Sequence, residues 1–198
     1  RPASGQTVTF TGPIWADQSK HFDTLTSGGL VSFAGSIAPP EISPLWWKKN
    51  AIPGTTDMTT AIQAALTASG GRLNIYLPTG SYLITDTLTL VNSGAGFNPV
   101  VFYGDGPFQS CIVNKASANK PSLSIVLGLV QIEGIGFWGD INFPNDGIKA
   151  VGGPSTYPSR LRINNCLMWA QGNGVFLESL HSAWITNCYG VVSSGSGI

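Results

Sequence analysis

Three carboxylate side chains in the second half of the sequence have types and spacing that could hydrolyse a glycosidic bond. Asp140 and Asp146 lie in the segment GDINFPND, and Glu178 follows in LESLHSAW. Such hydrolysis needs two carboxyl groups that face one groove, roughly 5 to 9.5 Å apart. We therefore take these three residues as catalytic candidates, with loop acids that only set turns as the alternative interpretation.

His181 stands three residues after Glu178, so the two could share a loop and exchange a proton. Neither has a recognisable nucleophile partner, and an exposed turn also explains them. An aspartate pair offers too few oxygen ligands for a calcium site, and the glycines of SGAGF and GDG lack the strand-to-helix context of a phosphate loop. The sequence thus predicts no metal and no cofactor, and it leaves the catalytic residues unknown.

Tryptophans are the better indicator of a ligand. Trp138 and Trp169 occupy equivalent places in a repeat described below, and Trp184 is expected to face outward from a strand. Flat aromatic surfaces stack on sugar rings or pack against a second subunit. These three residues are the ligand-binding candidates, with packing beneath a loop as the alternative.

An internal repeat must position these side chains. The segments VQIEGI, LRINNC and AWITNC begin at residues 130, 161 and 183, so their starts lie 31 and 22 residues apart. A second set, DGI, NGV and SGI, follows at residues 146–148, 173–175 and 196–198. Strand, corner and strand recurring at such a period predict an all-β solenoid of parallel coils, because each coil buries its inner face only against its neighbours.

The alternation within the repeat predicts which side chains face inward. VFYGDG at residues 101–106 fits the same template one coil earlier. The corner position is then occupied by Asp105, Gly134, Asn165 and Asn187, residue types that suit sharp turns. The period of two points Ile132, Ile163 and Ile185 inward, and Gln131, Arg162 and Trp184 toward solvent or a partner.

The three cysteines are not spaced as a zinc or thioredoxin-like motif. Cys166 and Cys188 take the same place in successive coils. We expect two small buried side chains stacked on each other with both thiols reduced. A disulfide between them is the alternative, and Cys111 has no assigned partner.

Composition supports stacked coils and excludes several classes of protein. Charged residues make up 10% of the chain, against about 25% in typical soluble domains. The net charge is zero, unlike that of a nucleic-acid binder. No apolar run is long enough for membrane insertion, and no secretion signal opens the chain. Because the chain begins at Arg1 and stops within a coil, we expect a piece of a longer protein.

The first part of the chain differs from the repeats. Residues 1–45 read as an N-terminal arm or linker that ends in a proline cluster, and residues 46–198 as a helix followed by the first coils of a C-terminally incomplete solenoid. We expect a helix at residues 57–68 to cap the first coil with Met58, Ile62 and Leu66. Trp46 and Trp47 are expected to anchor the arm to this helix.

The helix and the strands after it resemble the opening segment of the pectate-lyase-like right-handed parallel β-helix superfamily. The run DMTTAIQAALTASGGRLNIYLPTGSYLITDTLTL, followed by FYGDG, is similar to that family's pattern of a short helix, a strand ending in Pro-x-Gly-x-Tyr and a Gly-x-Gly turn. The matching positions are Asp57, Ala61, Ile62, Gln63, Ala64, Gly71, Pro78, Gly80, Tyr82, Gly104 and Gly106. The aspartate-rich start that is common in the family is replaced here by residues 53–58, PGTTDM.

This resemblance implies a function. The superfamily holds pectin-active lyases and hydrolases and phage tailspikes that bind or cleave bacterial surface polysaccharide. We expect the N-terminal part of a viral tailspike or fibre, which acts at the cell exterior as part of the virion tail and contacts other virion proteins through its N-terminal region. A homotrimer is expected, because uncharged faces and outward aromatics favour association. The alternative is a fragment of a secreted polysaccharide lyase or glycoside hydrolase, and a purely structural adaptor is a third possibility. Whether the longer protein is a polysaccharide depolymerase is left open, and this segment is expected to lack the catalytic residues.

Overall fold

The computed structural model describes residues 4–11, 21–22, 29–33, 41–70, 73–92, 99–117, 119–126, 128–140, 142–143, 145–152, 160–170 and 172–192. The first elements are β1 (Thr7–Phe10), β2 (Leu30–Phe33), β3 (Glu41–Ile42), the 3-10 helix η1 (Pro44–Trp46) and α1 (Thr59–Ala68). The coils follow as β4 (Asn74–Leu77), β5 (Gly80–Ile84), β6 (Leu88–Val91), β7 (Val100–Gly104), β8 (Ser110–Asn114), β9 (Leu123–Val126), β10 (Leu129–Glu133), β11 (Gly136–Trp138), β12 (Ile148–Val151), β13 (Arg160–Asn164), β14 (Leu167–Ala170), β15 (Val175–Glu178), β16 (Ser182–Thr186) and β17 (Tyr189–Val192).

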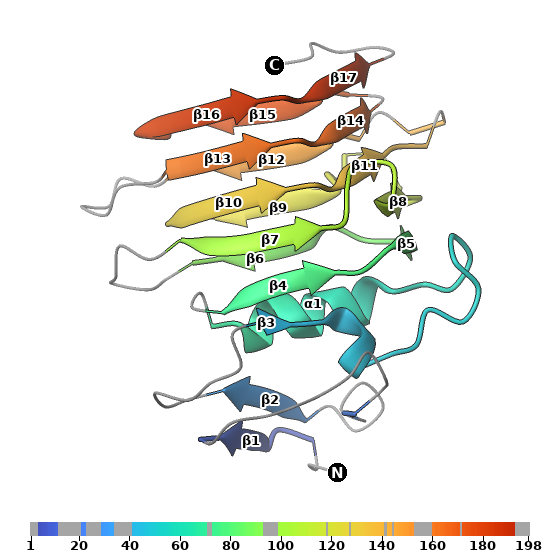
Figure 1. The fold of residues 1–198 in the computed structure, drawn as a ribbon, viewed down its shortest axis with the longest axis vertical. Coiled ribbons are helices and arrows are strands. Elements are labelled where there is room, and N and C mark those ends of the chain that lie inside the picture. The colour runs from blue at the N-terminus through green and yellow to red at the C-terminus, as the bar shows by residue number, and fades with distance from the viewer. Residues whose placement is uncertain are drawn as a thin grey trace.

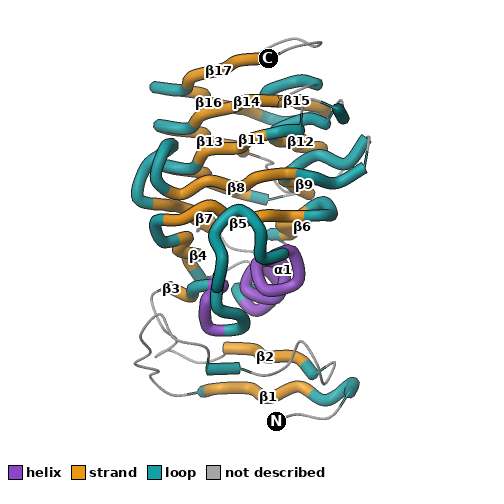
Figure 2. Tube along the Cα trace, turned by 90° about the vertical axis from the view of Figure 1, so that its right-hand side faces the viewer, coloured by secondary structure: helices purple, strands orange, loops and turns teal. Residues whose placement is uncertain are grey.

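These strands wind into a parallel β-solenoid of about five turns (Figure 1). Three parallel sheets run along it, with the orders β16-β13-β10-β7-β4-β3, β17-β14-β11-β8-β5 and β15-β12-β9-β6. Figure 2 shows the strands of successive coils one above another, with α1 below them. The predicted all-β solenoid is confirmed.

Alternating side chains build the core, because every second residue of a strand points inward. In the first sheet Ile132 pairs with Ile163, and Ile163 pairs with Ile185. Ile132 and Ile163 are fully buried, and Ile185 packs on the edge of the core. The predicted inward column is therefore confirmed. In the third sheet Ile148 pairs with Val175, as the second repeat predicted; residues 196–198 lie outside the described part of the chain.

The alignment of the earlier coil is wrong by one residue. The sequence repeat placed Val101 opposite Val130, whereas the structure pairs Val130 with Val100. Phe102 therefore enters the core, and Tyr103 faces outward, where its hydroxyl donates a hydrogen bond to Glu41. The run VVFYG offers two alternations, and burying the larger apolar ring while leaving the tyrosine hydroxyl outside selects between them.

The one-residue shift also changes which residue occupies the corner between the first and second sheets. Gly134, Asn165 and Asn187 all adopt left-handed backbone, with φ of 64°, 50° and 54°. A Cβ atom at Gly134 would lie only 2.7 Å from the carbonyl oxygen of Gly104, so this corner requires glycine. Gly104, rather than the predicted Asp105, is the equivalent residue in the coil below.

Asp105 instead joins two neighbouring turns. Its carboxylate accepts hydrogen bonds from the Tyr76 hydroxyl at 2.7 Å and from the backbone N–H and the hydroxyl of Thr79, both at 2.7 Å. The hydrogen bond from the Thr79 side chain lowers the pKa of Asp105 below its usual value, because its effect exceeds the opposing effect of partial burial. Asp105 therefore links two coils and does not form the predicted corner.

Helix α1 begins two residues later than predicted and buries the expected face. Met58, Ile62 and Leu66 are almost inaccessible to solvent. Burial disfavours the charged form of Asp57, but its Oδ1 accepts hydrogen bonds from the N–H (2.9 Å) and hydroxyl (2.6 Å) of Thr59, and the pKa of the carboxyl falls below its usual value. The helix contacts β6, η1 and β2.

Aromatic rings join the first part of the chain to this helix region. Trp46 and Trp47 are buried, and the ring of Phe22 lies 5.1 Å from that of Trp47 and 6.2 Å from that of Trp46. Phe33 on β2 meets Trp46 at 6.3 Å, in agreement with the expected anchoring role of the two tryptophans. Within residues 1–45, β1 pairs in parallel with β2, and β3 joins the first sheet beside β4.

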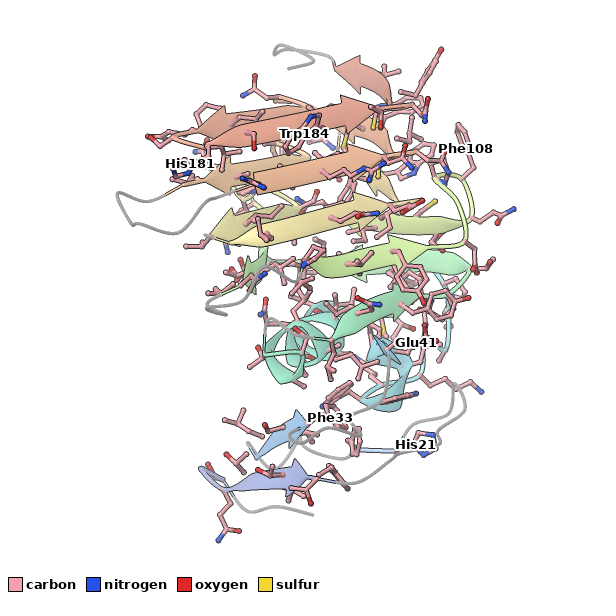
Figure 3. The ribbon with its side chains drawn as sticks, turned by 60° about the vertical axis from the view of Figure 1, so that its left-hand side comes forward. His21, Phe33, Glu41, Phe108, His181 and Trp184 are labelled. Atoms are coloured by element: carbon pink, nitrogen blue, oxygen red, sulfur yellow. The ribbon has the colours of Figure 1, made fainter. Side chains whose placement is uncertain are left out.

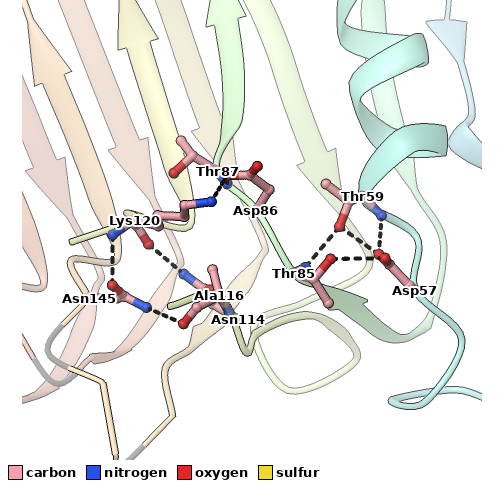
Figure 4. A network of polar contacts seen from close by, with 9 residues as sticks. All are labelled: Asp57, Thr59, Thr85, Asp86, Thr87, Asn114, Ala116, Lys120 and Asn145. Atoms are coloured by element: carbon pink, nitrogen blue, oxygen red, sulfur yellow. Dashed lines mark hydrogen bonds and ion pairs between the residues drawn. The ribbon is translucent and has the colours of Figure 1, made fainter. Parts of the chain in front are cut away.

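Buried amides hold the outer loops of the coils in place. The Asn145 side chain, 1% exposed, accepts from the Lys120 N–H at 2.8 Å and donates to the Ala116 carbonyl at 3.0 Å (Figure 4). In the same network Lys120 forms an ion pair of 3.0 Å with Asp86. Because these bonds satisfy backbone groups of a neighbouring loop, they fix each loop to the next coil.

Candidate functional site: an outward groove on the first sheet

A groove of about 490 Å³ lies on the outer face of the first sheet, across β10, β13 and β16. Figure 3 shows Trp184 over this face and His181 at one end of the same coil. Side chains of four consecutive coils contribute to the groove. The lining residues are Pro99, Leu129, Val130, Gln131, Arg160, Leu161, Arg162, Trp184 and Thr186.

The coil register places the key side chains in one outward column. Gln131 pairs with Arg162, and Arg162 pairs with Trp184. Because neighbouring strands lie about 4.8 Å apart, the three side chains follow one another at that spacing. Trp184 is 52% exposed, so one face of the indole is open to a ligand. The predicted outward direction of all three residues is confirmed.

A hydrogen-bonded column forms the neighbouring wall. Glu133 accepts from the Gln131 amide at 2.8 Å and from the Asn164 amide at 3.3 Å. The side-chain oxygen Oδ1 of Asn164 in turn accepts from the Thr186 hydroxyl and the Asn187 amide, both at 3.0 Å. Side chains from three coils are thus held in fixed orientations beside the groove.

The groove carries positive charge. Arg160 and Arg162 lie two residues apart on β13, so both point outward from the same face. Among the described residues, neither guanidinium has a hydrogen bond or ion pair to another side chain. Two cations without a counter-ion attract an anionic ligand, and guanidinium groups bind carboxylates through paired hydrogen bonds.

The three catalytic candidates do not reach this groove. Asp140 accepts from the N–H and side-chain amide of Asn142, its own loop neighbour, at 2.8 and 2.9 Å. Asp146 accepts from the Asn173 backbone N–H at 2.7 Å and the Asn173 amide at 3.1 Å. Glu178 ends β15 in the third sheet and is exposed. The two aspartates therefore have local structural partners, and the groove lining contains no carboxylate.

The other two tryptophans lie on a different sheet. Trp138 pairs with Trp169 across β11 and β14, and their rings stack with centroids 5.0 Å apart and planes 19° from parallel. Their predicted equivalence in the repeat is confirmed. Trp169, Tyr189 and Val191 are exposed on this second sheet and form an apolar face, distinct from the groove that contains Trp184.

Sequence reasoning missed Arg160, and it did not recognise Arg162 and Gln131 as parts of a site. The signal was present in the repeat, since Gln131, Arg162 and Trp184 share one outward column. The groove arises from the register between coils, and the type of a single aromatic or acidic residue contains no information about that register.

No family model, no curated protein and no solved structure matches this chain. Among the described residues, no three His, Cys, Asp or Glu side chains lie close enough together to bind a metal ion. In the same part of the chain, no helix is both long enough and apolar enough to cross a membrane.

Proposed function

We propose that the groove on the first sheet binds an acidic polysaccharide. The observation that carries this proposal is the combination of an exposed indole, Trp184, with the guanidinium groups of Arg160 and Arg162, which have no side-chain partner within the described part of the chain. An indole face stacks on the apolar face of a sugar ring, and the arginines bind carboxylates of the same glycan chain. The amide of Gln131 lines the floor and offers hydrogen bonds to hydroxyl groups.

The groove favours binding over hydrolysis. Hydrolysis requires two carboxyl groups across the scissile bond. Glu133 lies on β10 two residues after the groove residue Gln131, and two amides already occupy its oxygens. This segment therefore serves recognition, and degradation of the glycan belongs to other parts of a longer protein.

A wider proposal follows from the resemblance to the pectate-lyase-like superfamily. In it, the chain is the N-terminal part of a viral tailspike or fibre, with a right-handed coil and with α1 covering the first turn. The longer protein is a homotrimer on the virion tail that binds and degrades bacterial surface polysaccharide. The apolar face of Trp169, Tyr189 and Val191 supports association, since such faces are usually covered by a partner. Light scattering should give three chains per particle, and a monomer would favour the alternative of a secreted polysaccharide lyase or hydrolase.

Titration with two glycans tests the binding proposal. Alginate carries carboxylates and dextran does not, so we expect quenching or shift of tryptophan fluorescence with alginate alone. Trp184→Ala and Arg162→Gln should each weaken alginate binding about tenfold or more, since one lost charge-assisted contact is worth roughly 1.5–3 kcal/mol. Added salt should weaken it further.

Trp169→Ala is the matched control, because it removes an exposed indole from the second sheet. It should bind alginate as the wild type does. Equal losses in Trp169→Ala and Trp184→Ala, or equal affinity for dextran and alginate, would contradict the assignment of the groove.

A further inference from the structure

Cys166 and Cys188 lie one above the other at the corner between the first and second sheets. The pairs Asn164 with Thr186 and Leu167 with Tyr189 flank them on either side, so the two cysteines occupy equivalent positions in consecutive coils. Both are free thiols. The predicted stacking of two reduced cysteines is confirmed, but the prediction that both are buried is wrong for Cys188, which is only partly buried.

The two thiols differ in environment. Cys166 is 1% exposed and belongs to the core, whereas Cys188 is only partly buried. The neighbouring Cys166 side chain lowers the pKa of Cys188, while Cys188 and burial raise the pKa of Cys166. The Cys166 thiol itself donates to the Asn164 carbonyl oxygen at 3.3 Å. One sulfur is therefore suited to be a thiolate and the other to remain its thiol partner.

Uncharged groups cause this asymmetry. Among the described groups, the Cys166 thiol has the largest effect and lowers the pKa of Cys188. Burial raises this pKa, and the backbone of Cys166 and Thr186 lowers it. The carbonyl oxygens of Thr186 and Ile163 also lie 3.2 and 3.8 Å from its sulfur and accept from the thiol form. Because no formal charge is involved, the reactivity of the pair depends on contact between the two coils.

We propose that Cys166 and Cys188 form a redox-active pair in which Cys188 reacts with hydroperoxides and Cys166 then closes a disulfide between consecutive coils. This proposal is independent of glycan binding, because the corner lies outside the residues that line the groove.

The reaction proceeds in two balanced steps. The Cys188 thiolate attacks one oxygen of hydrogen peroxide, an S–O bond forms, the O–O bond breaks, and the hydroxide released takes up a proton to become water. The Cys166 thiol then loses its proton and attacks the Cys188 sulfur, an S–S bond forms, and the S–O bond breaks with release of a second water. The two sulfurs lose two electrons in total, and one peroxide is reduced to two waters.

The backbone geometry suits the product. Directly paired residues of neighbouring parallel strands have Cα atoms about 4.8 Å apart, within the range of roughly 4.4–6.8 Å that disulfides span. The bond would connect the β13–β14 corner to the β16–β17 corner and so join two coils covalently.

Cys111 provides an internal control. Burial raises the pKa of its thiol more than the nearby Trp138 indole lowers it, and its sulfur lies 3.6 Å from the Pro107 carbonyl oxygen. Cys111 pairs with Gly136, which pairs with Leu167, so Cys111 lies two coils away from Cys166. We therefore expect Cys111 to stay reduced under conditions that oxidise the pair.

The test treats the folded chain with a small excess of hydrogen peroxide and follows three readouts. The thiol count should fall from three to one per chain, the intact mass should fall by two hydrogen atoms, and peptide mapping should find one Cys166–Cys188 link. Thermal melting should rise by roughly 5–10 °C after oxidation and return after reduction. Intermolecular disulfides, a link that includes Cys111, or oxidation of Cys188 without a link would each overturn the proposal.

Variants separate the roles of the two sulfurs. In Cys166→Ala the thiol beside Cys188 is lost, so alkylation of Cys188 by iodoacetamide at pH 7 should slow at least several-fold, and peroxide should leave no intramolecular link. Cys111→Ser should react and close the disulfide as the wild type does. Unchanged alkylation of Cys188 in Cys166→Ala would contradict the proposed activation.

Discussion

Replacement of Ile62 tests whether α1 stabilises the solenoid by covering its first coil. Ile62 is fully buried in α1, in one cluster with the core residues of the coils. Ile62→Ala should cost about 2–5 kcal/mol, the usual range for removing a buried isoleucine side chain. Ile62→Asp should cost more, since it also places an unpaired carboxyl group in an apolar site.

Thermal unfolding followed by far-ultraviolet circular dichroism measures both changes. In a chain of this size, 1 kcal/mol corresponds to roughly 2–4 °C in Tm, so Ile62→Ala should melt about 4–20 °C below the wild type and Ile62→Asp lower still. Thr60→Asp is the matched control, because Thr60 is exposed in the first turn of the same helix and an acid there is tolerated.

A wild-type-like Tm for Ile62→Asp would refute the reasoning. It would mean that the coils fold without the helix and that the burial of Ile62 contributes little to their stability. A loss of helix signal with an unchanged main transition would lead to the same conclusion.

Two further predictions concern the polar contacts between coils. Because the Thr79 hydrogen bond lowers the pKa of Asp105, the carboxylate stabilises the fold above its unfolded pKa and loses this contribution as pH falls through the lower folded value. At pH 7, Asp105→Asn should thus lower the free energy of unfolding by about 1 kcal/mol or less for so exposed a group, with a slightly lower Tm. The difference from the wild type should vanish in melts near pH 2, and a difference that is constant with pH would contradict this. Asn145→Ala orphans the Lys120 N–H and one backbone carbonyl at about 1–3 kcal/mol each, so it should lower Tm by roughly 4–24 °C. An unchanged Tm would show that water replaces the amide.

The repeat at residues 130, 161 and 183 could be predicted because its residues admit only one register. Isoleucine alternates with polar side chains, and the corner residues Gly134, Asn165 and Asn187 tolerate left-handed backbone. A shift of one residue would bury Gln131 or Arg162 and expose the isoleucines, at a cost of several kcal/mol. Local pattern and burial therefore agree there.

The coil at residues 100–104 could not be aligned in the same way. Four consecutive residues, Val100 to Tyr103, are apolar or aromatic, so both alternations bury a plausible pair. What decides between them is the fit of the Phe102 ring against Ile75 and Ile132, and the Glu41 carboxylate that receives the Tyr103 hydroxyl. Glu41 lies 62 positions away in the sequence, beyond the reach of any local pattern.

In the candidate site, too, residues on strands could be predicted and residues in loops could not. The outward direction of Trp184 follows from strand parity alone, and it was predicted. The partners of Asp140 and Asp146 depend on loop conformation, and strand parity contains no information about loops. In a solenoid, equivalent strand residues of successive coils point in the same direction. The direction of a strand side chain is therefore easier to predict than that of a side chain in an insertion.

This regularity also explains why the groove and the cysteine pair occur where they do. In a parallel stack each side chain lies about one strand spacing from its equivalents in the next coils. Gln131, Arg162 and Trp184 are separated by 31 and 22 residues in the sequence, yet they form one continuous surface in the stack. The same stacking brings together Cys166 and Cys188, which are 22 residues apart in sequence. A shift in the register of β16 by one residue would therefore remove Trp184 from the groove and separate the two thiols at once, so glycan binding and disulfide formation should be lost together in any variant that shifts this strand.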